Sequence, residues 1–518
     1  MKKRAVWTGI TSSVGAGLGG LAIWDLVQKK HAILRNYPVV GHARFALEAI
    51  RPEIQQYFIE RNWDGRPFDR DTRSTVYARS KGEEGTQPFG TERDVLEEGY
   101  EYLAHSIVPV PQAEEPPRVR IGGPDCTQPY DMALMNVSAM SFGSLSANAI
   151  RALNKGAAIG GFAHDTGEGG ISTYHLENGG DLVWEIGSGY FGCRTATGDF
   201  DPEAFREKSR QSAVKMVSLK LSQGAKPGLG GVLPGPKVTE EIAAIRGVPV
   251  GETVVSPPYH RVFSTPKELI EFIATMRELS GGKPAGFKMC VSSRLEVLAL
   301  CKAMVELGVT PDFVIVDGSE GGTGAAPLEF EDHVGMPLTE GLMMWHNALI
   351  GAGLRDRVKI GASGKVAVSS DIVKRIIQGA DFTNSARTMM MAVGCIQAQA
   401  CDTGKCPTGV ATQDKRRQRA IDVPDKSHRV AAYQRTTVRQ AMSMMAAMGV
   451  DRPEDLRPWM LRRVVAPGVS RSYAELYEWL SPRSLVEGTD PRNEDEAAWK
   501  RDWDLVSAES FRVDGERT

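Results

Sequence analysis

Cysteine is scarce in this chain, and neither sign of charge prevails. Seven cysteines among 518 residues are an odd number, too few for a secreted scaffold held by disulfide bonds. Lysine and arginine number 62 against 64 aspartates and glutamates, so the formal net charge of -2 gives no electrostatic reason to expect nucleic acid as the main partner. Hydrophobic residues make up 42% and charged residues 24%, which excludes a mainly disordered or collagen-like chain.

A long uncharged stretch runs from Ala5 to Trp24, between a basic start and Asp25. Its 20 residues are enough to span a bilayer, although glycine, serine and threonine make the stretch only weakly apolar. We expect residues 1–30 to form an N-terminal membrane anchor, with residues 5–24 as a single helix in the membrane. The alternative is an apolar helix that lies on a protein surface or in an oligomer contact.

The rest of the chain reads as a cap, a barrel and an extension. We predict an N-terminal cap at 31–130, with helical spacing at 52–58 and 92–106, and a C-terminal helical extension at 416–518. Strand-like runs alternate with helical ones in between. The predicted strands are Asn136–Phe142, Gly161–Thr166, Met216–Leu221, Thr253–Ser256, Ala285–Val291, Asp312–Asp317, Arg357–Ala362 and Asp381–Ala386. Eight such units predict an α/β fold, a TIM (β/α)8 barrel over 131–415. A doubly wound open sheet is disfavoured, because no GxGxxG follows the first strand.

Most of the predicted strands end in runs of small or polar residues. In a TIM barrel these loops share the face that carries the chemistry, and glycine lets the backbone approach a flat ring or a phosphate closely. The last two loops, the usual phosphate pocket of such barrels, contain Ser363, Gly364 and Lys365, then Ser385, Ala386 and Arg387. One cation in each loop suits a phosphate dianion, so we predict a phosphate-bearing ligand here.

Three cysteines, Cys395, Cys401 and Cys406, follow the last strand in a C-x5-C-x4-C pattern. Structural zinc normally takes four ligands in closely spaced pairs, and no histidine lies near these three. Three thiolates suit a 3Fe–4S cluster, in which each iron takes one thiolate. A 4Fe–4S cluster with an outside ligand and three unligated cysteines stay open as alternatives. A one-electron centre beside a phosphate-binding barrel indicates FMN, which accepts single electrons and delivers a hydride.

Several motifs together carry a family resemblance. These are SAMSFGSLS, GEGG, QGAKPG, SPPYH, DGSEGGTGAAP and GCI followed by CPTGVATQ, spread from about Asn136 to Asp414. Together they resemble the FMN and 3Fe–4S synthase domain of glutamate synthase, and most closely the shorter glutamate synthase-like FMN proteins that lack the glutaminase domain. The resemblance implies a TIM barrel that condenses 2-oxoglutarate with ammonia and reduces the resulting imine.

The resemblance also implies roles for individual residues. Lys226 and Arg246 would bind the oxo acid, and Glu168 would stand where ammonia enters, holding ammonium or moving a proton. Lys288 would lie at the edge of the flavin ring and stabilise its reduced, anionic form. The implied flavin contacts are Ser138, Met140, Ser141, Gln223, Lys288, Gly322, Ser363, Gly364 and Arg387, beside Lys365 and Ala386 of the two phosphate loops.

Two departures from the family pattern affect the expected reaction. Val232 stands where the family has a glutamine that faces the substrate, which favours a different or less polar substrate. No cysteine precedes Cys126, so the cysteine nucleophile of the glutaminase is missing, and we expect free ammonia, an amine or a partner to supply nitrogen. No NAD(P)H fingerprint is visible, so electrons would arrive from ferredoxin or another partner.

The predicted function is therefore an FMN and iron–sulfur oxidoreductase that acts on CH–NH2 donors and reductively aminates a 2-oxo acid. We expect a homo-oligomer on the cytoplasmic face of a membrane, because clusters of this type are normally assembled in the cytoplasm. The first alternative is a membrane-tethered FMN dehydrogenase that oxidises an amino or hydroxy acid and passes electrons to a quinone. A non-enzymatic electron-transfer subunit is the second.

Overall fold

The computed structural model describes residues 2–83, 85–488 and 490–512. The chain forms two compact units, Met1–Thr72 and Arg73–Thr518. The first unit contains helices α1 (Lys2–Val27), α2 (Ala32–Asn36) and α3 (His42–Ile54), which a short π-helix (Gln55–Ile59) extends. The segment predicted to anchor the protein lies within α1. Nowhere in the described part of the chain is a helix both long enough and apolar enough to cross a membrane.

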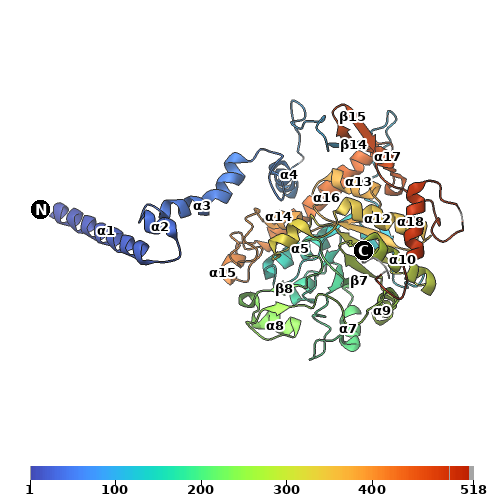
Figure 1. The fold of residues 1–518 in the computed structure, drawn as a ribbon, viewed down its shortest axis with the longest axis horizontal. Helices are drawn as coiled ribbons and strands as arrows, with labels where there is room; N and C mark the ends of the chain where they lie inside the picture. The colour runs from blue at the N-terminus through green and yellow to red at the C-terminus, as the bar shows by residue number, and fades with distance from the viewer. Residues whose placement is uncertain (1, 84, 489, 513–518) are drawn as a thin grey trace. The chain divides into compact units, whose positions relative to one another are not determined.

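Eight parallel strands of the second unit close into a barrel. Figure 1 shows helices of this unit around the strands. In order around the barrel they are β4 (Met135–Val137), β5 (His164–Asp165), β6 (Leu182–Ile186), β7 (Val214–Lys220), β10 (Ala285–Met289), β11 (Phe313–Asp317), β12 (Lys359–Ser363) and β13 (Phe382–Ser385). Strand β13 pairs with β4 and closes the ring. The predicted TIM barrel is confirmed, and the open sheet is excluded.

One predicted barrel strand is wrong. Residues 254–255 form β9 (Val254–Val255), which pairs antiparallel with β8 (Val232–Leu233) in a two-stranded sheet outside the barrel. The missing barrel strand is β6, whose five residues are all buried. A strand buried on both faces lacks the polar alternation that reveals a half-exposed one, and this is why the sequence pattern did not mark it.

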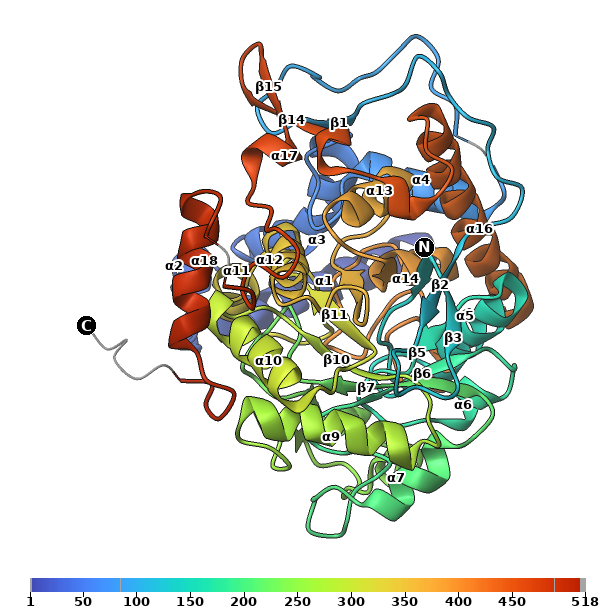
Figure 2. The same ribbon diagram turned by 90° about the vertical axis from the view of Figure 1, so that its right-hand side faces the viewer.

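Helices surround the barrel, and in Figure 2 α9, α10 and α12 lie beside β7, β10 and β11. The helices of this part are α4 (Arg70–Ser80), α5 (Ala147–Gly160), α6 (Thr173–Leu176), α7 (Pro202–Ser209), α8 (Glu240–Arg246), α9 (Pro266–Leu279), α10 (Arg294–Leu307), α11 (Leu328–His333), α12 (Leu338–Gly351), α13 (Ser369–Ile377), α14 (Arg387–Val393), α15 (Lys415–Gln418), α16 (Val423–Ala447), α17 (Tyr473–Leu476) and α18 (Glu494–Leu505). Helix α9 begins at Pro266, because Thr265 and Glu268 form a capping box around its first turn. Helix α16 follows the cysteine segment and packs on α5.

The cap and the extension share a small sheet. Residues 92–106, predicted to be helical, instead form turns and strand β1 (Glu101–Leu103). This strand pairs with β14 (Leu461–Ala466), and β15 (Val469–Ser472) completes the antiparallel sheet. Gly99 breaks the helical pattern, since its backbone adopts a φ of 90°.

Inside the barrel an apolar layer gives way to a polar one toward the carboxyl ends of the strands. The hairpin of β2 (Arg118–Ile121) and β3 (Tyr130–Ala133) contributes to the apolar layer, whose members are Ile121, Met132, Ala163, Val183, Met216, Phe313, Ile315 and Phe382. Because side chains alternate along a strand, the residues two or four positions after these apolar ones also point into the barrel. These are Asp165, Glu185, Lys220, Asp317 and Asn384, so charge gathers at the carboxyl ends.

Gly286 of β10 leaves room for Phe313 of β11 in the apolar layer of the barrel. A β-carbon at this position would lie 2.2 Å from the carbonyl oxygen of Phe313 and 2.8 Å from its ring. We expect Gly286→Ala to lower the free energy of unfolding by about 1–3 kcal/mol, because backbone and a buried ring must move. Chemical denaturation measures this loss. Gly85→Ala is the control, since a β-carbon there meets no atom within 4 Å, and an equal loss in both variants would contradict the argument.

Candidate active site

An ion pair spans the polar end of the barrel between β10 and β6. The ammonium of Lys288 contacts the carboxylate of Glu185, and both side chains are at most 5% exposed. Burial by itself lowers the pKa of Lys288, but the carboxylates of Glu185, Asp165 and Asp317 outweigh it and raise the pKa above its ordinary value. Lys288 is therefore a fixed cation at the centre of the catalytic face.

Asp165 of β5 lies beside this pair without a cation of its own. Burial and the negative charge of Glu185 raise the pKa of Asp165 to about 8, although Lys288 opposes them. Folding therefore favours the protonated form of this carboxyl group. It accepts the backbone N–H of Gly167 at 2.9 Å, and thereby holds the start of the loop that carries Glu168.

This proton makes the stability of the protein depend on pH. The folded protein binds it up to about pH 8, whereas the unfolded chain releases it near the ordinary pKa of 3.8. The stabilisation is complete below the lower value and is lost as the pH rises through the higher one. We expect Asp165→Asn, which cannot ionise, to gain stability relative to the wild type as the pH rises across this window. Denaturant titrations of both proteins at several pH values test this, and parallel stability profiles would contradict it.

Glu168 forms the second ion pair of the site. Its Oε1 lies 3.1 Å from the ammonium of Lys220, whose side chain is 9% exposed. Burial raises the pKa of Glu168, but Lys220, Arg246 and Lys288 together outweigh it and the pKa falls below its ordinary value. The carboxylate fits against two glycines: β-carbons on Gly187 and Gly231 would lie 2.3 and 2.1 Å from its oxygens. Glu168 is thus ionised and held in place.

Lys226 and Arg246 are the cations of this site that have no carboxylate partner. Both side chains are buried, at 3% and 6% exposure, and neither forms an ion pair with the described residues. Burial lowers the pKa of each, and the positive charge of Lys220 lowers that of Lys226 further. The Nε of Arg246 has no hydrogen-bond partner within the described chain, and its guanidinium lies 5.1 Å from the ring of Phe191. Two buried cations beside one ionised carboxylate fit an anionic ligand.

His260 of the SPPYH segment forms a hydrogen bond with the backbone of Lys220. Its Nε2 lies 2.8 Å from the carbonyl oxygen of Lys220, and its Nδ1 lies 3.2 Å from the hydroxyl of Tyr190. Burial lowers the pKa of His260 to about 4, so the ring is neutral at neutral pH. A neutral ring that donates to the carbonyl oxygen fixes the backbone of Lys220 without adding charge.

The loops predicted to hold a phosphate come together at the last strands. The hydroxyls of Ser138 and Ser363 lie 3.4 Å apart, joining the ends of β4 and β12. The guanidinium of Arg387 donates to the carbonyl oxygen of Glu320 at 2.6 Å and packs on Gly322, where a β-carbon would lie 2.8 Å from it. Gly364 and Lys365 follow β12, with positive φ at both positions, and Ala386 follows β13.

The other predicted flavin contacts lie on the same face. Met140 donates its backbone N–H to the carbonyl oxygen of Asp165, and the hydroxyl of Ser141 lies 2.8 Å from that of Ser144. Gln223 accepts from the ammonium of Lys220 at 2.9 Å. The structure therefore gathers the predicted residues of the barrel loops at one end of the barrel.

The three clustered cysteines lie close enough to influence one another. Burial, together with the neighbouring Cys401 and Cys406, raises the pKa of Cys395 to about 11. Backbone N–H groups of Thr408, Val410 and Ala411 overcome burial and lower the pKa of Cys406. No three His, Cys, Asp or Glu side chains among the described residues are grouped to hold a single metal ion. An iron–sulfur cluster does not require that, because each thiolate binds a different iron.

Cys401 connects this segment to the rest of the catalytic face. Its carbonyl oxygen accepts from the buried ammonium of Lys237 at 2.6 Å. Its β-carbon lies 3.9 Å from the position of a β-carbon on Gly324, in the loop after β11. The segment also reaches the loop after β4, because the amide of Gln413 donates to the carbonyl oxygens of Gly143 and Leu145.

Val232 lies in the two-stranded β8–β9 sheet, opposite Val255. Its side chain is 43% exposed, whereas the next residue, Leu233, is buried. Gly231, one residue before it, borders the carboxylate of Glu168. The position that departs from the family pattern is therefore at the rim of the site, next to the candidate catalytic carboxylate.

The sequence analysis missed three of the charged residues of the site. The sequence motifs assigned no role to Lys220, Glu185 or Asp165. In the structure Lys220 and Glu185 form ion pairs, and the pKa of Asp165 is raised. A usable signal was present, because each stands at the end of a strand with inward-facing apolar residues two or four positions earlier. Recognising it required the correct strand register, which included the missed β6.

The chain is similar to several known proteins. Residues 119–451 match the conserved region in glutamate synthase. The glutamate synthase large subunit-like protein YerD of Bacillus subtilis is 38% identical over 83% of this chain and 89% of its own length. The archaeal-type glutamate synthase (NADPH) of Thermotoga neapolitana is 34% identical over 62% of this chain and 60% of its own length. A mutant flavocytochrome b2 with pyruvate bound aligns over 86% of this chain and 93% of that one, with 14% identity and a TM-score of 0.43.

Proposed function

The chain belongs to the family of the conserved glutamate synthase region, and on that premise we propose that it converts a 2-oxo acid and ammonia, or an amine, into an amino acid with FMN as its redox group. The family is one of oxidoreductases. The observation that carries the proposal is the pair of buried cations, Lys226 and Arg246, which form no ion pair with the described residues and accompany the ionised carboxylate of Glu168. This set can bind an acidic substrate and manage a proton within one site.

The two cations set the substrate class. A 2-oxo acid with a second carboxylate, such as 2-oxoglutarate or an analogue, would satisfy both Lys226 and Arg246 through charge-assisted hydrogen bonds. Valine at 232 offers no hydrogen bond at the rim, so we expect an analogue with a less polar end to be accepted as well.

Glu168 is the residue that would handle nitrogen. Its ionised carboxylate can hold ammonium or a protonated amine and remove a proton, leaving the free amine that attacks the carbonyl carbon of the oxo acid. Loss of water from the adduct gives the imine, which then receives a hydride at carbon and a proton at nitrogen. The raised pKa of Asp165 favours its protonated form and the lowered pKa of Glu168 favours its ionised form, so the two carboxyl groups would offer an acid and a base.

The loops after the last strands fit FMN. Ser138, Ser363, Gly364, Lys365, Ala386 and Arg387 would hold the phosphate side, and Met140, Ser141, Gln223, Lys288 and Gly322 would surround the ring. Asn384, inside the barrel next to these loops, is 3% exposed, and its Oδ1 lacks a hydrogen-bond partner within the described chain. When bound, FMN supplies the hydride, and the fixed cation Lys288 would stabilise the negative charge of its reduced form.

The cysteine segment fits a 3Fe–4S cluster that would deliver single electrons to the flavin. Support comes from the mutual influence of the three thiols, the N–H groups around Cys406, and the buried ammonium of Lys237 near Cys401. These N–H groups and this cation would stabilise thiolates. Electrons would come from ferredoxin or another electron-transfer partner.

Removal of either substrate cation tests the proposed function. We expect Lys226→Ala and Arg246→Ala to weaken binding of the oxo acid roughly ten- to a hundredfold, which corresponds to about 1.5–3 kcal/mol for one charged hydrogen bond. The flavin content should stay unchanged, because the phosphate has its own loops. Single-turnover reoxidation of the reduced flavin by a panel of oxo acids, with and without ammonia, measures this. Lys215→Ala, at the opposite end of β7, is the control.

The same panel also tests the choice of substrate. Val232→Gln should shift the preference toward 2-oxoglutarate if this rim position contacts the substrate. If no oxo acid reoxidises the flavin of the wild-type protein, with or without ammonia, the proposed reaction is wrong.

A further inference from the structure

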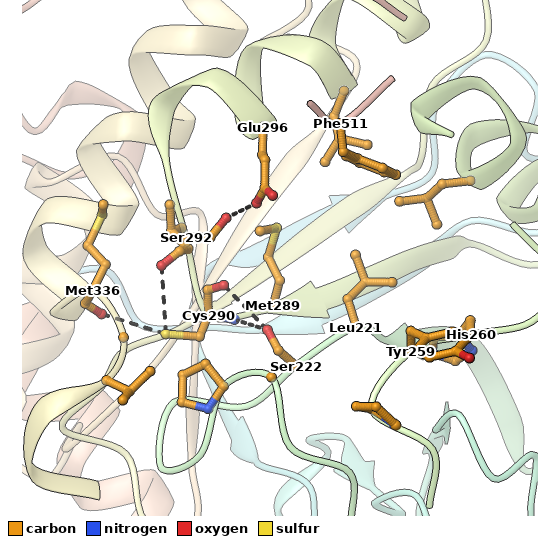
Figure 3. Close-up of a pocket in the computed structure, with 18 of the residues that line it drawn as sticks. Leu221, Ser222, Tyr259, His260, Met289, Cys290, Ser292, Glu296, Met336 and Phe511 are labelled. Atoms are coloured by element: carbon orange, nitrogen blue, oxygen red, sulfur yellow. Dashed lines mark hydrogen bonds between the residues drawn. The ribbon is translucent and has the colours of Figure 1, made fainter. Parts of the chain in front are cut away.

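A cavity of about 800 Å3 lies on the outer side of the barrel wall, at the carboxyl ends of β7 and β10 (Figure 3). Its floor is apolar, with Leu221, Met289, Leu300 and Phe511 among the residues that line it. Phe511 comes from the C-terminal segment and packs against the same core as helices α9 and α10. The volume is in the range of small-molecule sites in proteins.

This cavity shares a wall with the candidate active site but is separate from it. Lys220 and Lys288 are paired across β7 and β10 and point into the barrel, so the next residues, Leu221 and Met289, point outward into the cavity. The hydroxyl of Ser222 joins the strand ends, since it accepts the N–H of Cys290 at 2.9 Å and donates to its carbonyl oxygen at 3.3 Å. The strand pair therefore separates the two sites.

The charges around the cavity have one sign. Two carboxylates, Glu296 and Glu340, line it, and none of its described lining residues is a lysine or an arginine. Glu296 accepts a hydrogen bond from the hydroxyl of Ser292, which keeps its carboxylate beside the cavity (Figure 3). His260, the remaining titratable nitrogen base in the lining, is neutral because burial lowers its pKa to about 4. An apolar floor with an acidic edge complements a cation that carries an apolar group.

We propose that this cavity binds a small cationic amine with an aromatic or aliphatic body, at a site distinct from the catalytic one. The apolar body packs against Leu221, Met289 and Phe511, and the ammonium group faces Glu296 and Glu340. His260 lines the cavity and also forms a hydrogen bond with the carbonyl oxygen of Lys220. His260 therefore connects the bound amine to the Lys220–Glu168 ion pair.

Calorimetric titration of the purified full-length protein with three matched probes tests this assignment. The probes are 2-phenylethylamine, 2-phenylethanol and phenylacetate, which share a ring and differ in charge. We expect the amine to bind about tenfold more tightly than the alcohol, with a preference that falls as salt is added, and phenylacetate not to bind. Equal affinity for the amine and the alcohol would overturn the assignment, and so would the absence of binding by all three probes.

Variants locate the bound probe. Glu296→Gln and Glu340→Gln should each weaken the amine about two- to fivefold and leave the alcohol unchanged, as expected for partly exposed ion pairs. Phe511→Ala should weaken both probes, because it removes apolar contact. Glu271→Gln, an exposed carboxylate on α9 outside the lining, is the matched control and should change nothing.

One further variant separates this proposal from the proposed function. Glu168→Gln should leave amine binding in the cavity unchanged, because Glu168 lies inside the barrel mouth. If the amine is lost in Glu168→Gln and retained in Glu296→Gln and Glu340→Gln, the probe occupies the catalytic site and the cavity assignment is wrong. If Phe511→Ala does not fold, the two glutamine variants and their control still decide the outcome.

Discussion

Replacing Glu168 by glutamine is expected to lower turnover about a hundredfold or more, with substrate affinity changed only a few-fold. The magnitude is that of a lost general acid–base group. Glutamine keeps the size of the side chain and one oxygen near Lys220, but it cannot take a proton or hold ammonium. Steady-state and single-turnover rates with saturating ammonia and oxo acid measure the effect. Glu203→Gln, an exposed carboxylate on α7, is the control.

The glycines around Glu168 provide an independent test of the same role. A β-carbon on Gly231 would lie 2.1 Å from Oε1 of Glu168, so Gly231→Ala must move the carboxylate and loosen its 3.1 Å contact with Lys220. Turnover should fall in this variant although every charged group is still present. Normal turnover in both Glu168→Gln and Gly231→Ala would show that the carboxylate has only a structural role.

The barrel could be predicted from sequence because its signals are local. Strands followed by glycine-rich loops recur along the chain, and a Thr265–Glu268 capping box marks the start of α9. Strand β6 gave no such signal, since all five of its residues are buried and show no alternation. Residues 254–255 do form a strand, as predicted, but their pairing with β8 could not be predicted from the local sequence.

The candidate site, like the fold, was only partly predictable from the sequence. The family resemblance pointed to Glu168 and Lys226 through short motifs and to Arg246 as an arginine downstream of them. Their charge states could not be predicted, because the ion pair of Glu168 depends on Lys220, which reaches it from another strand. Likewise the raised pKa of Asp165 depends on Glu185, a residue of the missed strand. Contacts between strands need the register of the closed barrel, which no single segment encodes.

Replacing Cys401 by serine is expected to abolish the iron–sulfur cluster while the barrel stays folded and keeps its flavin. Cys401 lies in an irregular segment after α14, outside the strands and helices that form the core. Its main anchor, the bond from Lys237 to its carbonyl oxygen, does not involve the side chain. The substitution therefore removes a thiolate and little packing. Iron should fall from about three atoms per chain toward none.

The loss of the cluster should separate two steps of the reaction. Flavin in Cys401→Ser that has been reduced chemically should still be reoxidised by oxo acid and ammonia, because Glu168, Lys226 and Arg246 are unchanged. Reduction through an electron-transfer partner should fail, since single electrons no longer have a path to the flavin. Cys126→Ser is the control and should retain its iron. Cys126 lies far from the cysteine segment in the sequence, and its sulfur contacts the carbonyl oxygen of Gly282. Zinc without iron in the wild-type protein, or unchanged iron in Cys401→Ser, would refute the proposed cluster.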